Sequence, residues 1–326
     1  MQAEWQPTCS IELLRLRAQV LADIRRFFSA RAVLEVETPL LSLSSGTDPQ
    51  LDFFTTDYCS PPLRQAMFLQ TSPEFAMKRL LAAGSGSIYQ IGKAFRNGES
   101  GRFHNPEFTL LEWYRVGFTL PQLMDEIAEL MTVLFKGLRT LGPTQRCSYQ
   151  DLFQDTTGLN PLVFSYPDYC AYAQERDMPE AAALCGADHG LWLDFIFSHK
   201  VQPHLGDNAV CMVYGYPACQ SSLARLNADN PQVTDRVEIF INGIELGNGY
   251  YELADAQEQD RRFDEEQIIR RQKKRPETVK NKRLIAALES GLPECSGMAI
   301  GLDRLLMLLA NSAAIADVLN FPLYRS

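Results

Sequence analysis

The stretch from Ile88 to Tyr114, IYQIGKAFRNGESGRFHNPEFTLLEWY, carries the strongest structural signal in this chain. Two alternating apolar and polar runs, 88–95 and 108–114, flank a charged, glycine-rich loop, which predicts antiparallel strands with a long connection. Arg96 follows the first strand and Phe108 begins the second. Such a hairpin could hold a phosphate with the guanidinium and stack a base on the ring. The simpler interpretation is a surface hairpin with incidental charge.

Composition bounds the class of protein. The 326 residues fit two average domains or one large mixed domain, and 46% hydrophobic content is typical of a globular chain with a sizeable core. A net charge of -9 argues against broad nucleic-acid binding, which draws its affinity from Lys and Arg on phosphate. The sequence shows no secretory leader pattern, no membrane-spanning apolar run and no CxxC pair among eight cysteines. We therefore expect a reduced, cytoplasmic protein without membrane contact.

The N-terminal half has helix and strand signals around this hairpin. Residues 11–28 predict an amphipathic helix capped by Ser10, and a short strand over 33–38 ends before Pro39. Because proline cannot donate to a strand ladder, this strand is expected at a sheet edge, where another subunit could pack. A helix is predicted over 71–81, with Thr71 or Ser72 as its cap and Pro73 in its first turn, and another over 121–138.

Strand patterns return in the C-terminal half, after residues 141–205, whose mixed pattern we interpret as an insertion decorating the main sheet. The runs AVCMVYGYP and RVEIFINGIELGNGYYEL are predicted to be strands. The second run contains Glu238, Glu245 and Glu252 at short intervals. Neighbouring carboxylates of this kind could hold a divalent cation or an ammonium group, although surface strands also carry such charges. The charged helix over 255–274 is interpreted as solvated surface.

The run CSGMAIGLDRLLMLLANS, residues 295–312, predicts a strand that turns into a helix apolar nearly all round. Such a helix must be buried, yet Asp303 and Arg304 stand at its entrance. A buried arginine is costly unless an anion meets it, so either a ligand anion or a structural ion pair is expected there.

Together these stretches resemble the class II aminoacyl-tRNA synthetases, whose three motifs correspond to residues 25–39, 95–112 and 297–304. The segments HNPEFTLLEWY, GIELGNGYYEL and GLDRLLML are similar to the corresponding segments of lysyl-tRNA synthetases. The resemblance covers residues 10–140 and 205–326. It implies an α+β fold with an antiparallel sheet flanked by helices, in a single catalytic domain over 1–326 with an insertion around 141–205.

The chain departs from the lysyl-tRNA synthetase pattern in four features. The chain has no room for the N-terminal anticodon-binding domain of lysyl-tRNA synthetases, and Ala299 stands at their pocket glycine, where one methyl is worth ~1–3 kcal/mol. Ser72 stands where many of them have alanine. These features resemble the stand-alone paralogues that ligate lysine to elongation factor P. Gly98 replaces the usual glutamate, so either Glu99 substitutes for it or contacts to adenine are weaker.

The resemblance implies that ATP activates (R)-β-lysine as an adenylate, which then passes to a lysine side chain of elongation factor P. It implies a homodimer that uses ATP and Mg²⁺ and no tRNA. The catalytic residues would be Arg96 on the α-phosphate and Arg304 on the γ-phosphate. The implied ATP contacts are Arg96, Asn97, His104, Phe108, Glu238, Glu245 and Arg304, with Glu238 and Glu245 as the metal ligands.

The implied amino-acid contacts are Ser72, Glu74, Glu112, Tyr114, Asn248, Tyr250, Glu252 and Ala299. Glu112 and Glu252 would surround the distal ammonium, Glu74 the other amino group, and Asn248 the carboxylate. Two alternatives stay open: a short aminoacyl ligase for a small-molecule amine, and a non-catalytic synthetase-like regulatory subunit. Regulatory paralogues typically lose the phosphate-binding arginines or metal acids, which are present here.

Overall fold

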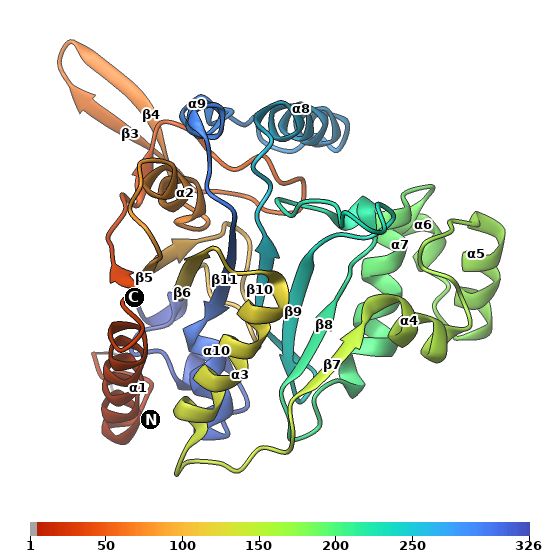
Figure 1. Ribbon diagram of the computed structural model, residues 1–326, viewed down its shortest axis with the longest axis horizontal. Helices are drawn as coiled ribbons and strands as arrows, with labels where there is room; N and C mark the ends of the chain where they lie inside the picture. The colour runs from red at the N-terminus through yellow and green to blue at the C-terminus, as the bar shows by residue number, and fades with distance from the viewer. Residues whose placement is uncertain (1–4) are drawn as a thin grey trace.

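An eight-stranded sheet forms the centre of the computed structural model, which describes residues 5–326 (Figure 1). Its six inner strands are antiparallel, and each edge strand runs parallel to its neighbour. The expected α+β class is confirmed, but the sheet is mixed rather than purely antiparallel. In spatial order its strands are β1 (Leu34–Glu35), β5 (Ile88–Phe95), β6 (Glu107–Val116), β11 (Cys295–Gly301), β10 (Ile244–Tyr251), β9 (Arg236–Ile241), β8 (Cys211–Tyr214) and β7 (Gln145–Ser148).

The predicted hairpin is present. Strands β5 and β6 pair from Ile88 opposite Tyr114 to Phe95 opposite Glu107. The strand before Pro39 lies at the sheet edge as expected, although only Leu34–Glu35 pairs with β5. The hairpin therefore occupies the same end of the sheet as the N-terminal motif.

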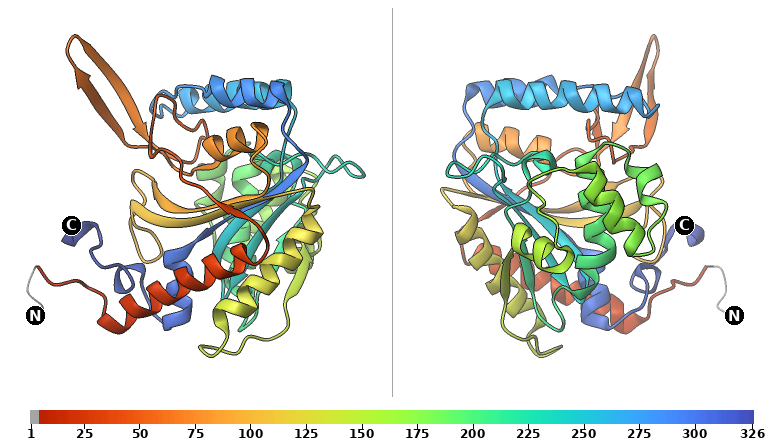
Figure 2. Two further views of the ribbon diagram at one scale, coloured as in Figure 1. Left: turned by 60° about the vertical axis from the view of Figure 1, so that its left-hand side comes forward. Right: turned by 90° about the vertical axis from the view of Figure 1, so that its right-hand side faces the viewer.

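One face of the sheet packs on α1 (Ile11–Ser29), α3 (Leu120–Phe135) and α10 (Leu302–Ala310), which lie together below it in Figure 2. Apolar residues of these helices and of the strands form the largest core, which includes Phe28, Trp113, Ile127 and Leu305. Ser10 caps α1 as predicted, because its hydroxyl accepts a hydrogen bond from the Leu13 amide. The alternating pattern of β6 sends Leu111 and Trp113 to this core and leaves Glu112 and Tyr114 for the opposite face.

The opposite face carries α2 (Glu74–Ala82), with α8 (Ala256–Gln272) and α9 (Lys282–Ser290) above it (Figure 2). The predicted cap of α2 was wrong by one residue or more: Pro73 holds the N-cap position, and the Ser72 hydroxyl only accepts from the Glu74 amide at 3.4 Å. Pro73 can take that position since it needs no amide partner there.

The surface interpretation of α8 was also wrong for part of the helix. Arg262 and Arg270 are buried, and Arg270 is 1% exposed. Their guanidinium groups donate to backbone carbonyls, those of Ser222 and Ala224 for Arg262 and those of Asp48, Leu51 and Pro276 for Arg270. A polar sequence pattern cannot distinguish a solvated arginine from one whose donors are all used by loops.

Residues 141–205 extend the sheet and build a second core. Besides β7 they form α4 (Tyr149–Thr157), α5 (Tyr166–Glu175), α6 (Ala181–Cys185), α7 (His189–Ile196), η1 (Phe197–Val201) and η2 (Gln202–His204). Their core is aromatic and includes Tyr149, Phe153, Trp192 and Phe197. The segment thus adds an edge strand and a layer of helices at the right of Figure 1.

The remaining elements are short. A separate three-stranded sheet of β2 (Leu41–Ser42), β4 (Leu63–Leu69) and β3 (Thr55–Ser60) includes the hairpin that projects from the body in Figures 1 and 2. Single turns form η3 (Ala218–Gln220), η4 (Ile315–Asp317) and η5 (Leu323–Arg325). Within residues 5–326, every helix is too short or too polar to cross a bilayer.

Candidate active site

The register of the sheet brings the predicted residues of four strands into two neighbouring rows. Cα pairing runs from Glu112 on β6 to Ala299 on β11, Asn248 on β10 and Glu238 on β9. Two residues along, it runs through Tyr114, Gly297, Tyr250 and Arg236. Since side chains two apart share a face, both rows point to the side covered by α2. Residues from distant parts of the sequence therefore form one surface.

Gly297 leaves the room that this surface needs. A β-carbon at that position would lie 2.4 Å from the Tyr114 ring and 2.7 Å from Oε1 of Glu252. No side chain fits at those distances, so the glycine allows Tyr114 and Glu252 to lie over the strand.

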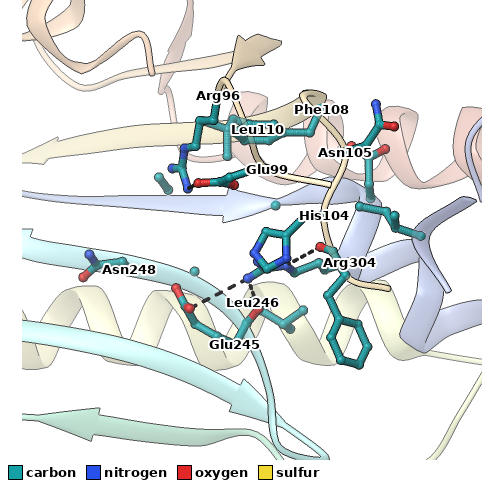
Figure 3. Close-up of a pocket in the computed structure, with 16 residues that line it drawn as sticks. Arg96, Glu99, His104, Asn105, Phe108, Leu110, Glu245, Leu246, Asn248 and Arg304 are labelled. Carbon is teal, nitrogen blue, oxygen red and sulfur yellow. Dashed lines mark hydrogen bonds and ion pairs between the residues drawn. The ribbon is translucent and has the colours of Figure 1, made fainter. Parts of the chain in front are cut away.

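An open pocket, here called the hairpin pocket, lies between the β5–β6 connection, β10, β11 and the start of α10 (Figure 3). It is lined by Arg96, Glu99, Phe103, His104, Asn105, Phe108, Leu110, Glu245, Leu246, Gly247, Asn248, Ala299, Gly301, Asp303, Arg304 and Ile315. Seven of the predicted site residues are among them. Arg96, Arg304, the Phe108 ring and the partly exposed carboxylate of Glu245 match the chemistry of a nucleoside triphosphate.

Arg304 is held in place by the hairpin loop and by β10. Its Nε donates to the Phe103 carbonyl at 3.1 Å, and Nη1 donates to the Glu245 carbonyl at 2.9 Å. Nη2 lies 2.7 Å from Nε2 of His104. Because a guanidinium can only donate, this histidine nitrogen must accept and carry no proton. Burial lowers the pKa of His104 and the charge of Arg304 lowers it further, which favours the same neutral form.

Arg96 has spare donors in the same pocket. Its guanidinium lies over the Phe108 ring, 5.0 Å from the centroid, and Nη1 is 3.7 Å from Oε1 of Glu99. Within the described residues 5–326, its buried Nε has no hydrogen-bond partner. A buried donor without a partner is costly, so this atom favours an anionic acceptor.

The departure at Gly98 has a conformational reason. Its φ is +81°, in the left-handed region that residues with a β-carbon rarely adopt, whereas the next residue, Glu99, lines the hairpin pocket. Glu99, and not Gly98, therefore presents a carboxylate to the hairpin pocket.

Between these rows and α2 lies a second group of side chains, here called the acidic pocket, which consists of Glu74, Lys78, Glu112, Tyr114 and Glu252. The ammonium of Lys78 is 2.6 Å from Oε1 of Glu74 and 2.6 Å from Oε2 of Glu252. The Tyr114 hydroxyl donates to Oε1 of Glu112 at 2.7 Å. The predicted pair of Glu112 and Glu252 is therefore accompanied by a lysine of the chain itself.

Burial dominates the electrostatics of the acidic pocket. Burial and, to a smaller extent, the nearby Glu74 raise the pKa of Glu112 to about 8, against the opposing effect of the Tyr114 hydroxyl. For Glu252, burial raises the pKa and the Lys78 ammonium opposes it. Burial would lower the pKa of Lys78, but Glu252 and Glu74 offset this and keep it above its ordinary value.

The two predicted metal ligands differ. Glu245 has a side chain 39% exposed in the hairpin pocket, where its Oε2 lies 3.8 Å from Nη1 of Arg304 (Figure 3). Glu238 is engaged: Oε1 lies 2.5 Å from Arg236 and Oε2 accepts from the Tyr216 hydroxyl at 2.6 Å. Among residues 5–326 no cluster of three or more His, Cys, Asp or Glu side chains could hold a metal. Mg²⁺ commonly takes only one or two carboxylates plus phosphate and water oxygens, and Glu245 fits that requirement as it stands.

The structure separates some predicted residues from these pockets. Asn97 lies beside Asp52 in an isolated bridge, and Ser72 lies just before α2; neither lines the hairpin pocket. Prediction missed Lys78 and Arg236. The spacing of Glu74 and Lys78, four apart on a helix, signalled an ion pair. Arg236 stood two residues before Glu238, on the same strand face, and it also approaches Oδ1 of Asn248 at 3.3 Å.

Comparison with known proteins adds to this geometry. The model of a family described as tRNA synthetases class II (D, K and N) matches residues 7–325. A Vibrio vulnificus protein named elongation factor P--(R)-beta-lysine ligase is 45% identical over 324 residues, 99% of each chain. Proteins of the same name from Pasteurella multocida and Proteus mirabilis are each 42% identical, over 98% and 99% of both chains.

Proposed function

This chain belongs to the class II tRNA synthetases of the D, K and N group, and from that premise we propose that it is an elongation factor P–(R)-β-lysine ligase. It is an ATP-dependent, AMP-forming enzyme. The relatives that carry this name align over nearly the full length of both chains.

One observation in particular supports the substrate: the hairpin pocket adjoins the acidic pocket through a shared row of the sheet. Asn248 and Ala299 line the hairpin pocket, and Ala299 is the register partner of Glu112. A nucleotide on one side and an ammonium-bearing side chain on the other would therefore meet at Asn248 and Ala299. A carboxylate placed there could attack a phosphate held by Arg96.

The first step joins the two substrates. The β-lysine carboxylate oxygen attacks the α-phosphorus of ATP, a P–O bond forms, and pyrophosphate leaves. Arg96 binds the α-phosphate and stabilises the charge that grows during attack. Arg304, fixed by three contacts, binds the γ-phosphate and covers the adenine opposite Phe108.

The second step transfers the acyl group. A deprotonated lysine side-chain amine of elongation factor P attacks the acyl carbon, an amide bond forms, and AMP leaves. Glu112 and Glu252 hold the distal ammonium of the acyl group during both steps, with Tyr114 beside them. We keep Ser72, Asn97 and Tyr250 as further proposed substrate contacts; Tyr250 lies in the second row of the sheet, and Ser72 and Asn97 lie outside the hairpin pocket.

We assign Mg²⁺ to Glu245, with Glu238 joining only if it releases Arg236 and Tyr216. A bound ion would neutralise charge on the departing pyrophosphate. We also propose that the chain is one catalytic domain with residues 141–205 as an insertion, that it uses no tRNA, and that it forms a homodimer. The exposed apolar side chains near edge strand β1 support the homodimer; they are Leu34, Leu40, Leu41 and Leu43.

The main competing function is ligation of an amino acid to a small-molecule amine. The burial of Glu112 and Glu252, at 2% and 3% exposure, favours a substrate with an ammonium group, since a neutral side chain would leave them unpaired. It does not by itself select the acceptor.

Incubation with ATP, (R)-β-lysine and unmodified elongation factor P tests the acceptor directly. Mass spectrometry should detect one added β-lysyl group on the factor. An unmodified factor, together with efficient charging of tRNA or of a free amine, would refute the proposal. The variant Arg96→Ala should slow adenylate formation about 10²–10³-fold, since it removes a preorganised donor. The control variant Lys93→Ala should leave the rate of adenylate formation unchanged, because Lys93 lies on the same hairpin but pairs with Glu107 outside the hairpin pocket.

A further inference from the structure

Lys78 has no part in the mechanism above, yet it occupies the centre of the acidic pocket. It is a lysine of α2 with 1% of its side chain exposed. Its ammonium contacts Glu74 from its own helix and Glu252 from the chain just after β10, both at 2.6 Å. Buried lysines are rare unless they are paired, and this one bridges two acids that the proposed function assigns to the substrate.

The third acid of the acidic pocket remains open. Glu112 is 2% exposed, and among residues 5–326 its Oε2 has no hydrogen-bond partner, whereas Oε1 is used by Tyr114. Oε2 of Glu252 also lacks a hydrogen bond from these residues, but it lies 2.6 Å from the Lys78 ammonium. Glu74 and Glu252 thus share a resident cation, which Oε2 of Glu112 does not contact. A carboxylate oxygen buried without a partner favours an incoming cation.

The charges explain why a lysine is useful at this position. When ionised, three carboxylates and one ammonium leave two negative charges in the acidic pocket. The acyl part of β-lysine, once its carboxylate is joined to phosphate, carries two ammonium groups. Resident and incoming charges then balance, whereas three carboxylates without Lys78 would repel one another and take up protons.

We propose that Lys78 is a positioning residue of the amino-acid site, whose ammonium holds Glu74 and Glu252 in place so that the acidic pocket matches a doubly charged substrate. This inference rests on the proposed function for the identity of the substrate. Lys78 itself touches neither substrate carboxylate nor phosphate; it acts through the acids.

Other titratable groups face these acids from the surrounding elements. They are Tyr114 on β6, Tyr250 on β10, Cys295 on β11 and Glu266 on α8. Burial raises the pKa of Tyr114, Tyr250 and Cys295, so these three stay neutral near pH 7. Burial raises the pKa of Glu266 to about 7, the nearby Asp48 and Glu74 add to the rise, and a hydrogen bond from Thr47 opposes it, so Glu266 also titrates in the range tested.

The test compares Lys78→Met with a matched control. Lys280 also bridges two carboxylates, those of Asp260 and Asp264 at 2.8 and 2.5 Å, but on the outer side of α8. Pyrophosphate exchange driven by (R)-β-lysine is measured from pH 6 to 9 for wild type, Lys78→Met and Lys280→Met. ATP affinity is measured in parallel as a readout of the intact hairpin pocket.

Lys78→Met should raise the KM for β-lysine at least about tenfold, because loss of one partner leaves buried carboxylates unpaired. Since removal of a cation raises carboxylate pKa values, the rising limb of kcat/KM should move about one pH unit higher. ATP affinity and the Lys280→Met profile should match wild type. An unmoved pH limb, or a lower kcat at unchanged KM, would overturn the proposal and leave Lys78 a structural ion pair.

Two further variants keep the proposal testable if Lys78→Met does not fold. Lys78→Arg keeps the cation, and its pH limb should stay at the wild-type position. The double variant Lys78→Met/Glu74→Gln restores two negative charges, so its limb should return toward wild type even if its activity stays low; a limb that stays displaced contradicts the charge argument. If wild type activates another amino acid instead of β-lysine, the proposed function fails, and the same comparison on that amino acid still tests Lys78.

Discussion

At the scale of single residues, Glu112 makes substrate binding dependent on pH. Its pKa is raised to about 8 by burial and by Glu74, so it is neutral below that pH and ionised above it. An ammonium group binds the ionised form. The affinity for β-lysine should therefore rise from pH 6 to 8, approaching tenfold per unit where Glu112 must lose a proton.

Calorimetry in two buffers of different ionisation enthalpy measures this release of a proton. At pH 7 the apparent enthalpies of β-lysine binding in the two buffers should differ, because the released proton is taken up by buffers with different ionisation enthalpies. Above pH 8 the two apparent enthalpies should converge. Glu112→Gln should bind β-lysine weakly, with a flat profile over the same range. Equal wild-type affinity at pH 6 and 8 would show that Glu112 is already ionised in the empty protein.

Ala299 is the residue-scale candidate for selectivity, because its methyl group lies between Glu112 and Asn248 in one row. Ala299→Gly should shift the ratio of kcat/KM for β-lysine and α-lysine toward α-lysine by about tenfold, as one methyl in a pocket is worth ~1–3 kcal/mol. Competitive pyrophosphate exchange with both isomers measures the ratio. An unchanged ratio would assign the discrimination to other side chains.

At the scale of elements, α8 depends on its buried arginines. Arg270 donates to three carbonyls and to Asp52, and so ties the helix to residues 48–52. Arg270→Ala leaves these acceptors without partners and should lower the free energy of unfolding by about 3 kcal/mol. Arg271→Ala is the matched control, since its exposed side chain bonds only to the Gln267 carbonyl one turn earlier. Denaturant unfolding of both variants measures the difference; similar losses would contradict the role of Arg270.

Elements with a strong period could be predicted from sequence, and elements fixed by tertiary contacts could not. The β5–β6 hairpin and α1 appear close to their predicted bounds because alternation and amphipathicity are local. The burial of Arg262 and Arg270 depends on carbonyls such as those of Ser222 and Asp48, 40 and 222 residues away in the sequence, which no local pattern encodes. The arrangement of the site is likewise not encoded locally. The sequence motifs identified Glu112, Asn248 and Ala299, but their alignment in one row depends on strand pairing. The position of Lys78 between Glu74 and Glu252 depends on the packing of α2 against the sheet.

At the scale of the whole molecule, two cores meet at strands β8 and β9. Met212 and Ile239 belong to the core shared with α3 and α10, whereas Val213 and Phe240 belong to the aromatic core of residues 141–205. This segment is therefore packed into the sheet as well as attached to its edge. It supplies β7 and covers the second face of two strands that also support Glu238.

This sharing limits how the chain could be shortened. Excision of residues 141–205 to obtain a minimal catalyst would expose Val213 and Phe240, each at most 1% exposed, along an open strand edge. Apolar side chains beside unpaired backbone groups recruit further strands, so a trimmed protein would aggregate. A useful minimal version would have to replace the helical layer with another cover, and the catalytic strands could then keep their register.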